Sequence, residues 1–97
     1  MNLIEPSKSI VKIIEIFFPQ AKVYLFGSRA RGDYKETSDF DIAIDNGAPI
    51  SMTEKGQIIS MIDALNIPQK VDVVDLNRIP EKFKKVILQE GVHITPQ

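Results

Sequence analysis

Apolar residues recur every three or four positions in three segments of the chain, which is the spacing of one side of an α-helix. The first segment covers residues 6–18 and ends before Pro19. The second begins at Ser51 and Glu54, which match a helix capping box, and the third begins at Pro80 and ends at Gly91. The side chains expected to face the core are Ile10, Ile13, Ile14 and Phe17 in the first helix, Ile58, Ile62 and Leu65 in the second, and Phe83, Val86 and Ile87 in the third.

Four shorter segments show the pattern of β-strands. Residues 22–26 and 71–76 are rich in β-branched, aromatic and aliphatic side chains, residues 39–45 alternate between apolar and acidic side chains, and residues 92–94 form a last short segment. A polar loop over residues 27–38 has room for one helical turn near Arg29. The order α-β-β-α-β-α-β predicts an α/β fold, with helices covering one face of a small mixed β-sheet.

The size and composition favour a single small domain over residues 1–97. Hydrophobic residues make up 43% of the chain and charged residues 26%, which is ordinary for a soluble globular protein. The absence of cysteine excludes disulfides and thiolate metal sites, and it suits a reducing cytoplasm. No apolar run reaches the roughly 20 residues that span a bilayer, and the first residues lack the order of a signal peptide. We therefore expect a cytoplasmic protein without membrane contact.

Three aspartates form a candidate metal site. Asp39 and Asp41 are two positions apart on a predicted strand, so their side chains share one face about 7 Å apart. Asp72 lies between valines on the next predicted strand and can face the same point if the two strands are neighbours. Such carboxylates suit Mg²⁺, with one or two ions that also bind substrate phosphate oxygens. The alternative is a solvated strand surface; Asp45 and Asp75, near strand ends, are interpreted as solvated or capping residues.

A glycine-serine loop after the first strand forms a candidate phosphate site. Gly27 allows the backbone to approach a phosphate, the Ser28 hydroxyl can donate to a phosphate oxygen, and Arg29 and Arg31 can supply positive charge. The formal net charge is −1, so anion binding must be local and direct binding to nucleic acid is not expected. The lysine and hydroxyl residue that complete a Walker loop are missing after Gly32. A plain turn is the alternative.

Together, these motifs resemble the signature of a known family. The pattern Gly27-Ser28-Arg29-Ala30-Arg31-Gly32, then Ser38-Asp39-Phe40-Asp41, then Val71-Asp72-Val73 on a later strand, resembles the minimal nucleotidyltransferase family of the DNA polymerase β-like superfamily. The resemblance covers nearly the whole chain and implies a fold like the palm of polymerase β. It also implies that Gly27 and Ser28 hold the triphosphate, that Asp39 and Asp41 bind two Mg²⁺ ions, that Asp72 binds the catalytic ion and helps deprotonate the attacking hydroxyl, and that Arg29 or Arg31 steadies phosphate or a partner surface.

The resemblance further implies an activity and a partner. Minimal members of the family include antitoxins encoded beside a helical HEPN-type ribonuclease toxin, which transfer AMP from ATP to a tyrosine hydroxyl of the toxin and bind it. We therefore expect an adenylyltransferase antitoxin that uses ATP and recognises a HEPN-type toxin. Two alternatives stay open: a nucleotidyltransferase for a small molecule or a nucleic-acid end, with a separate acceptor-binding subunit, and a non-catalytic module that neutralises a toxin by contact.

Overall fold

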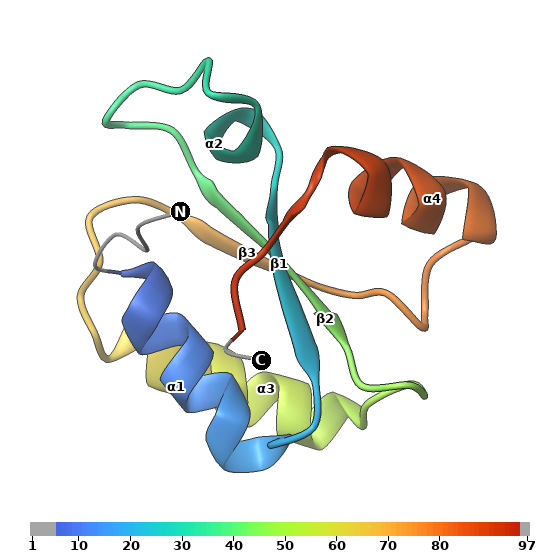
Figure 1. Cartoon of the computed structure of the whole chain (residues 1–97). Helices are drawn as coiled ribbons and strands as arrows, with labels where there is room; N and C mark the ends of the chain where they lie inside the picture. The colour runs from blue at the N-terminus through green and yellow to red at the C-terminus, as the bar shows by residue number, and fades with distance from the viewer. Residues whose placement is uncertain (1–5, 96–97) are drawn as a thin grey trace.

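A computed structural model describes residues 6–95, which form a four-stranded sheet with helices packed against it (Figure 1). Residues 1–5 and 96–97 lie outside the described part, so the signal-peptide prediction, which concerns residues 1–8, falls mostly outside it. The elements, in chain order, are α1 Ser7–Phe17, β1 Lys22–Phe26, α2 Ser28–Arg31, β2 Phe40–Asp45, α3 Met52–Asp63, β3 Val71–Asp75, α4 Glu81–Glu90 and β4 Val92–His93. The predicted order is confirmed, and α2 is the helical turn expected near Arg29. None of the helices described is long and apolar enough to cross a membrane.

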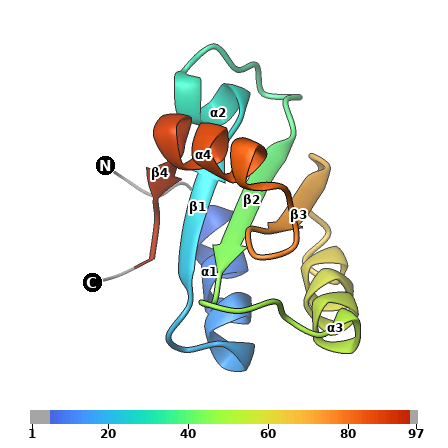
Figure 2. The ribbon, with the colours of Figure 1, turned by 90° about the vertical axis from the view of Figure 1, so that its right-hand side faces the viewer.

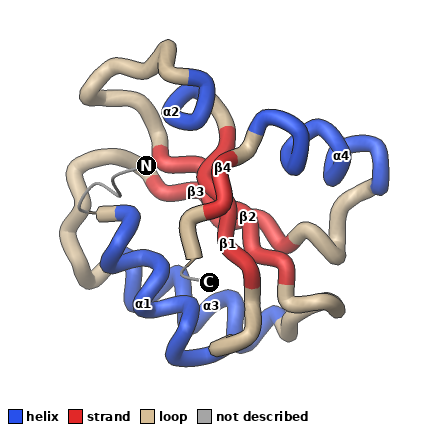
Figure 3. The backbone as a smooth tube through the Cα atoms, viewed as in Figure 1, coloured by secondary structure: helices blue, strands red, loops and turns tan. Residues whose placement is uncertain are grey.

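The sheet is mixed, as the sequence predicted. Its strand order is β3-β2-β1-β4. β1 runs antiparallel to β2 and β4, whereas β2 and β3 are parallel. The connection between the parallel strands contains α3, which lies along one face of the sheet (Figure 3). Because two parallel strands begin at the same edge of a sheet, the segments that precede β2 and β3 meet there.

The larger part of the core lies between one sheet face and the pair α1 and α3. Successive strand residues point to opposite faces, so every second residue of β1 and β2 joins this core. The start of α3 is fixed by the predicted cap, in which the Ser51 hydroxyl oxygen accepts the Glu54 N–H at 3.1 Å. The side chains in this core cluster include Ile10, Ile13 and Ile14 from α1, Ile58 and Ile62 from α3, and Val23, Leu25, Phe40, Ile42 and Ile44 from the strands.

Helix α4 packs on the opposite face of the sheet, so the helices cover both faces rather than one as predicted (Figure 2). Ile87 of α4 joins a second cluster with Ala43 and Leu76, and Tyr24 and Val74 pack against it. These strand residues point away from α1 and α3, and their apolar surface needs its own cover. The physical reason for the difference is that the second face of β1, β2 and β3 is partly apolar as well.

Three residues predicted to face the core are exposed instead. Phe83 and Val86 of α4 are 55% and 53% exposed, because only a narrow side of the helix centred near Ile87 rests on the sheet. Leu65 is 41% exposed, because α3 ends at Asp63 and Leu65 no longer follows its buried side. The helical spacing therefore identified the helices correctly but overestimated how much of each helix is buried.

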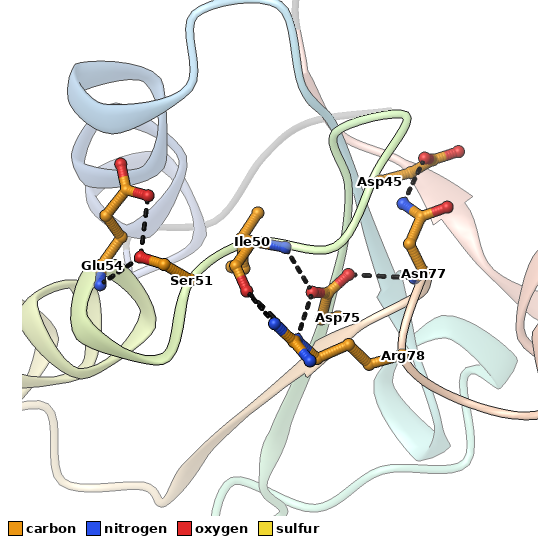
Figure 4. Close-up of polar contacts among 7 residues, drawn as sticks. All are labelled: Asp45, Ile50, Ser51, Glu54, Asp75, Asn77 and Arg78. Atoms are coloured by element: carbon orange, nitrogen blue, oxygen red, sulfur yellow. Dashed lines mark hydrogen bonds and ion pairs between the residues drawn. The ribbon is translucent and has the colours of Figure 1, made fainter.

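The carboxyl ends of β2 and β3 are held by capping aspartates, as expected for Asp45 and Asp75 (Figure 4). Asp75 is only 3% exposed, and its carboxylate accepts the backbone N–H groups of Ile50 and Asn77, each at 2.9 Å. Arg78 supplies the compensating charge at 3.6 Å. Asp45 accepts the Asn77 side-chain amide at 3.0 Å, which lowers the pKa of Asp45 despite its partial burial. Both residues therefore stabilise turns at the sheet edge opposite to Asp41.

Candidate active site

The three predicted metal ligands lie at the amino edge of the parallel strands β2 and β3. Asp41 and Asp72 are direct register partners in this pair, so the condition on which the sequence prediction depended is met. Neighbouring strands are about 4.8 Å apart, which brings the two carboxylates onto one small area of the sheet. Asp39 precedes the first residue of β2 instead of lying within the strand, and its side chain is exposed.

The electrostatics of the site centre on Asp41. Burial raises the pKa of Asp41 above its ordinary value, and the negative charges of Asp72 and Asp39 raise it further. The positive charges of Arg31 and Lys70 act in the opposite direction. Lys70 also contacts Asp72 directly, with its Nζ 3.5 Å from Oδ1. The three aspartates are therefore close enough to interact, and their mutual repulsion is only partly neutralised by protein cations.

The donor set fits a hard divalent cation such as Mg²⁺. Carboxylate oxygens are the ligands that Mg²⁺ prefers, and a cation between them would relieve the repulsion that raises the pKa of Asp41. Within residues 6–95, no three acidic, histidine or cysteine side chains already converge into a closed ligand group. The exposed side chain of Asp39 has room to rotate toward Asp41.

Gly27 places the glycine-serine loop directly against Asp41. Its backbone has φ 76° and ψ −157°, a combination that is accessible essentially to glycine alone. A Cβ atom at this position would lie 2.2 Å from Asp41 Oδ2 and 3.1 Å from its Cγ. Ser28 follows as the first residue of α2. The fold therefore joins the two candidate sites that the sequence presents 14 positions apart, since no side chain separates the Gly27 backbone from the Asp41 carboxylate.

The two arginines of the loop have different surroundings. Arg29 is buried, and its guanidinium donates to the backbone carbonyls of Ser38 at 3.2 Å and Glu36 at 3.0 Å. It also stacks over the Phe40 ring at 3.9 Å, on the side of the α1–α3 core. These contacts occupy the planar donor group, so we assign Arg29 to the structure of the loop and not, as predicted, to phosphate. Arg31 is half-exposed and acts on Asp41, so it stays the candidate phosphate ligand.

One residue of the site was missed by the sequence analysis. The Oε1 atom of Glu90, the last residue of α4, accepts the Gly27 N–H at 3.1 Å and lies 3.5 Å from Arg31 Nη1. Gly91 marked the end of this helix in the sequence, but nothing local indicated that the helix ends beside the loop. The antiparallel pairing of β4 with β1 brings them together, and that pairing is a long-range property.

Comparison with known proteins identifies the family. Residues 8–97 match the family described as polymerase beta, nucleotidyltransferase. The chain belongs to this nucleotidyltransferase family. It is 31% identical over 80 residues to the "Probable protein adenylyltransferase MntA" of Haemophilus influenzae, which corresponds to 81% of this chain and 70% of that protein.

The fold of this nucleotidyltransferase also matches solved structures. A toxin–antitoxin structure with AMP-PNP superposes with a TM-score of 0.75 at 24% identity, covering 93% of this chain and 73% of that one. A complex of a tri-AMPylated Shewanella oneidensis HEPN toxin with an MNT antitoxin gives a TM-score of 0.69 at 22% identity, covering 93% and 69%. At these identities the structural matches establish the fold, and they confirm the predicted α/β nucleotidyltransferase architecture.

Proposed function

We propose that this nucleotidyltransferase is an Mg²⁺-dependent adenylyltransferase antitoxin, which transfers AMP from ATP to a tyrosine hydroxyl of a HEPN-type toxin. The observation that carries the proposal is the contact between the Gly27 backbone and Asp41, beside the Asp41–Asp72 register pair. It brings a loop able to approach phosphate next to carboxylates able to bind a metal. The protein adenylyltransferase name of the H. influenzae relative and the AMPylated toxin complex support the choice of AMP and of the partner.

Each residue of the site has its own role in the proposed transfer. In the proposed reaction, the tyrosine oxygen bonds to the α-phosphorus of ATP, the bond from this phosphorus to the bridging oxygen breaks, and pyrophosphate leaves with that oxygen. Asp72 accepts the hydroxyl proton, as a general base placed beside the reacting atoms. Asp39, Asp41 and Asp72 would hold up to two Mg²⁺ ions, which supply charge neutralisation for the triphosphate. Gly27 and Ser28 approach the phosphates, and Arg31 supplies a positive charge.

This assignment makes positioning the main source of catalysis. Holding the two reactants in line converts a bimolecular step into an effectively unimolecular one, and charge neutralisation lowers the barrier further. The strand register and the Gly27 backbone fix the relative positions of the carboxylates and the loop. The toxin contributes the acceptor hydroxyl, so it is a co-substrate as well as a binding partner.

The proposal is tested by incubating the chain with labelled ATP, Mg²⁺ and the helical protein encoded beside it. The parent should label that partner on tyrosine, as read by mass spectrometry, and chelation of Mg²⁺ should prevent labelling. The double variant Asp39→Ala with Asp41→Ala should lose the label, whereas Asp45→Asn, at the far end of the same strand, should keep it. Labelling by the double variant would show that the metal site is wrongly assigned.

A protection assay separates catalysis from binding. If the double variant neutralises the toxin as well as the parent does, the chain acts as a non-catalytic binding module. If the partner is never labelled but a small molecule or a nucleic-acid end accepts AMP in its place, the acceptor is wrongly assigned. A folded double variant, judged by its circular dichroism and thermal midpoint, is required for either conclusion.

A further inference from the structure

Glu90 lies opposite Gly27 because of the pairing between β1 and β4. The register partners are Tyr24 with His93 and Leu25 with Val92, and extending this antiparallel pairing by two positions brings residue 90 beside residue 27. The Glu90 carboxylate uses this position to accept the Gly27 N–H at 3.1 Å. The end of α4 is thereby joined to a loop 63 positions away in the sequence.

The same carboxylate oxygen also faces Arg31. The distance from Glu90 Oε1 to Arg31 Nη1 is 3.5 Å, and Arg31 Nε lies at the same distance from Asp33. The Glu90 side chain is 30% exposed, whereas that of Arg31 is 48% exposed. One partly buried oxygen therefore contacts both the Gly27 N–H and the Arg31 guanidinium.

The backbone of Glu90 is held by the core and the sheet. Ile87, one turn earlier, is buried against the second sheet face, and its carbonyl accepts the Gly91 N–H at 2.7 Å. A Cβ at Gly91 would lie 2.6 Å from that carbonyl oxygen, so the chain turns tightly from α4 into β4. These contacts hold the backbone of Glu90 in place. Its side chain can therefore hold the Gly27 end of the loop in a defined position.

The geometry points to Glu90 as a positioning residue, which sets the Gly27 backbone and the Arg31 guanidinium for nucleotide phosphate without touching the substrate. This inference rests on the proposed function, because it assumes that the loop receives a triphosphate. A carboxylate beside a phosphate site repels the ligand unless it is engaged elsewhere. Here it is engaged by an N–H group and a guanidinium, and both partners belong to the loop.

Amide hydrogen exchange tests the contact itself, without nucleotide. Removal of a charged acceptor in Glu90→Ala should speed exchange at the Gly27 amide about tenfold, while amides in the middle of β1 keep their protection. Glu90→Gln keeps an acceptor oxygen and should stay within about threefold of the parent. Gln89→Ala, an exposed neighbour on the same helix, should have no effect. Unchanged Gly27 exchange in Glu90→Ala would overturn the inference.

Calorimetry with AMP-PNP and Mg²⁺, and the kinetics of AMP transfer, test the role. Glu90→Ala should weaken AMP-PNP binding about tenfold and raise the KM for ATP with kcat nearly unchanged, which is the signature of lost uniform binding. Glu90→Gln should keep both the AMP-PNP affinity and the KM for ATP close to those of the parent. Faster Gly27 exchange with unchanged affinity and KM would show a purely structural contact and overturn the positioning role. If the parent binds no nucleotide, the proposed function fails, and the ligand-free exchange still decides whether Glu90 holds Gly27.

Discussion

The contact between Gly27 and Asp41 makes Gly27→Ala an informative substitution. The new Cβ would lie 2.2 Å from Asp41 Oδ2, so this oxygen must retreat by at least about 1.2 Å to reach 3.4 Å, where ordinary contact begins. The carboxylate is the end of a side chain and can rotate away, whereas the Gly27 backbone is held by Glu90. We therefore expect Asp41 to move and the fold to persist.

Gly27→Ala should lower the free energy of unfolding through backbone strain at residue 27 and through the displaced Asp41 side chain. The glycine-only backbone region of Gly27 costs another residue about 1–3 kcal/mol, and an off-rotamer Asp41 adds about 1 kcal/mol. For a chain of this length, a loss of about 2–4 kcal/mol lowers the thermal midpoint by roughly 10–20 °C. A misplacement of about 1 Å at a reacting centre costs on the order of a hundredfold in rate. The loss of activity should therefore be far larger than the loss of folded protein at low temperature.

Gly32→Ala is the matched control. Gly32 also has a positive φ, 87°, but a Cβ at this position would meet nothing within 4 Å. Its backbone strain should cost about 1–2 kcal/mol and leave the site intact. The assay is AMP transfer to the partner at about 15 °C, where both variants stay folded, with circular dichroism on the same samples. Transfer by Gly27→Ala at the rate of Gly32→Ala would refute the reasoning, since strain without displacement of Asp41 would then explain both variants.

Two further predictions concern single charges. Burial raises the pKa of Asp41, and the negative charges of Asp72 and Asp39 raise it further. Folding therefore favours the protonated form of Asp41. The free energy of unfolding falls as the pH rises from the ordinary carboxyl pKa through the raised pKa. Asp41→Asn should therefore raise the thermal midpoint at neutral pH in a chelator, with a gain that shrinks toward acid pH; a lower midpoint at neutral pH contradicts this. Arg29→Ala should lower the free energy of unfolding by about 2–4 kcal/mol in urea titrations, because it removes a buried guanidinium with its hydrogen bonds to backbone carbonyls and its stack on Phe40. The half-exposed Arg31→Ala should cost about 1 kcal/mol or less, and equal losses for the two arginines would argue against the structural role of Arg29.

The secondary structure could be predicted because the core imposes it. The alternation of Phe40, Ile42 and Ile44 and the helical spacing around Ile10 and Ile14 both come from burial on one side, and all five residues lie in the larger cluster. The start of α3 could also be predicted, because the Ser51 cap depends only on residues close to it in the sequence. The helix-on-both-faces arrangement was not predicted, because apolar spacing marks a helix without saying which face of a sheet receives it.

The candidate site was predictable only as far as its residues form a local pattern. The pairing of Asp41 with Asp72 depended on strand adjacency, which the motif suggested and the sheet order confirms. Arg29 and Arg31 were both predicted candidates for phosphate from their place in the loop motif, but the guanidinium of Arg29 donates to backbone carbonyls of the loop, which the motif does not indicate. Glu90 reaches the loop only through the β1–β4 pairing, which no short segment of sequence encodes.

The two faces of β2 couple the packing of the core to the orientation of the site. Along this strand, Phe40, Ile42 and Ile44 belong to the core, whereas Asp41 belongs to the opposite face. Because strand side chains alternate, a slip of one residue would turn the carboxylate into the α1–α3 core and move the isoleucines to the face on which α4 packs. The packing of Phe40, Ile42 and Ile44 therefore also fixes the face to which Asp41 points, so a one-residue insertion or deletion within β2 would disrupt the core and the site together.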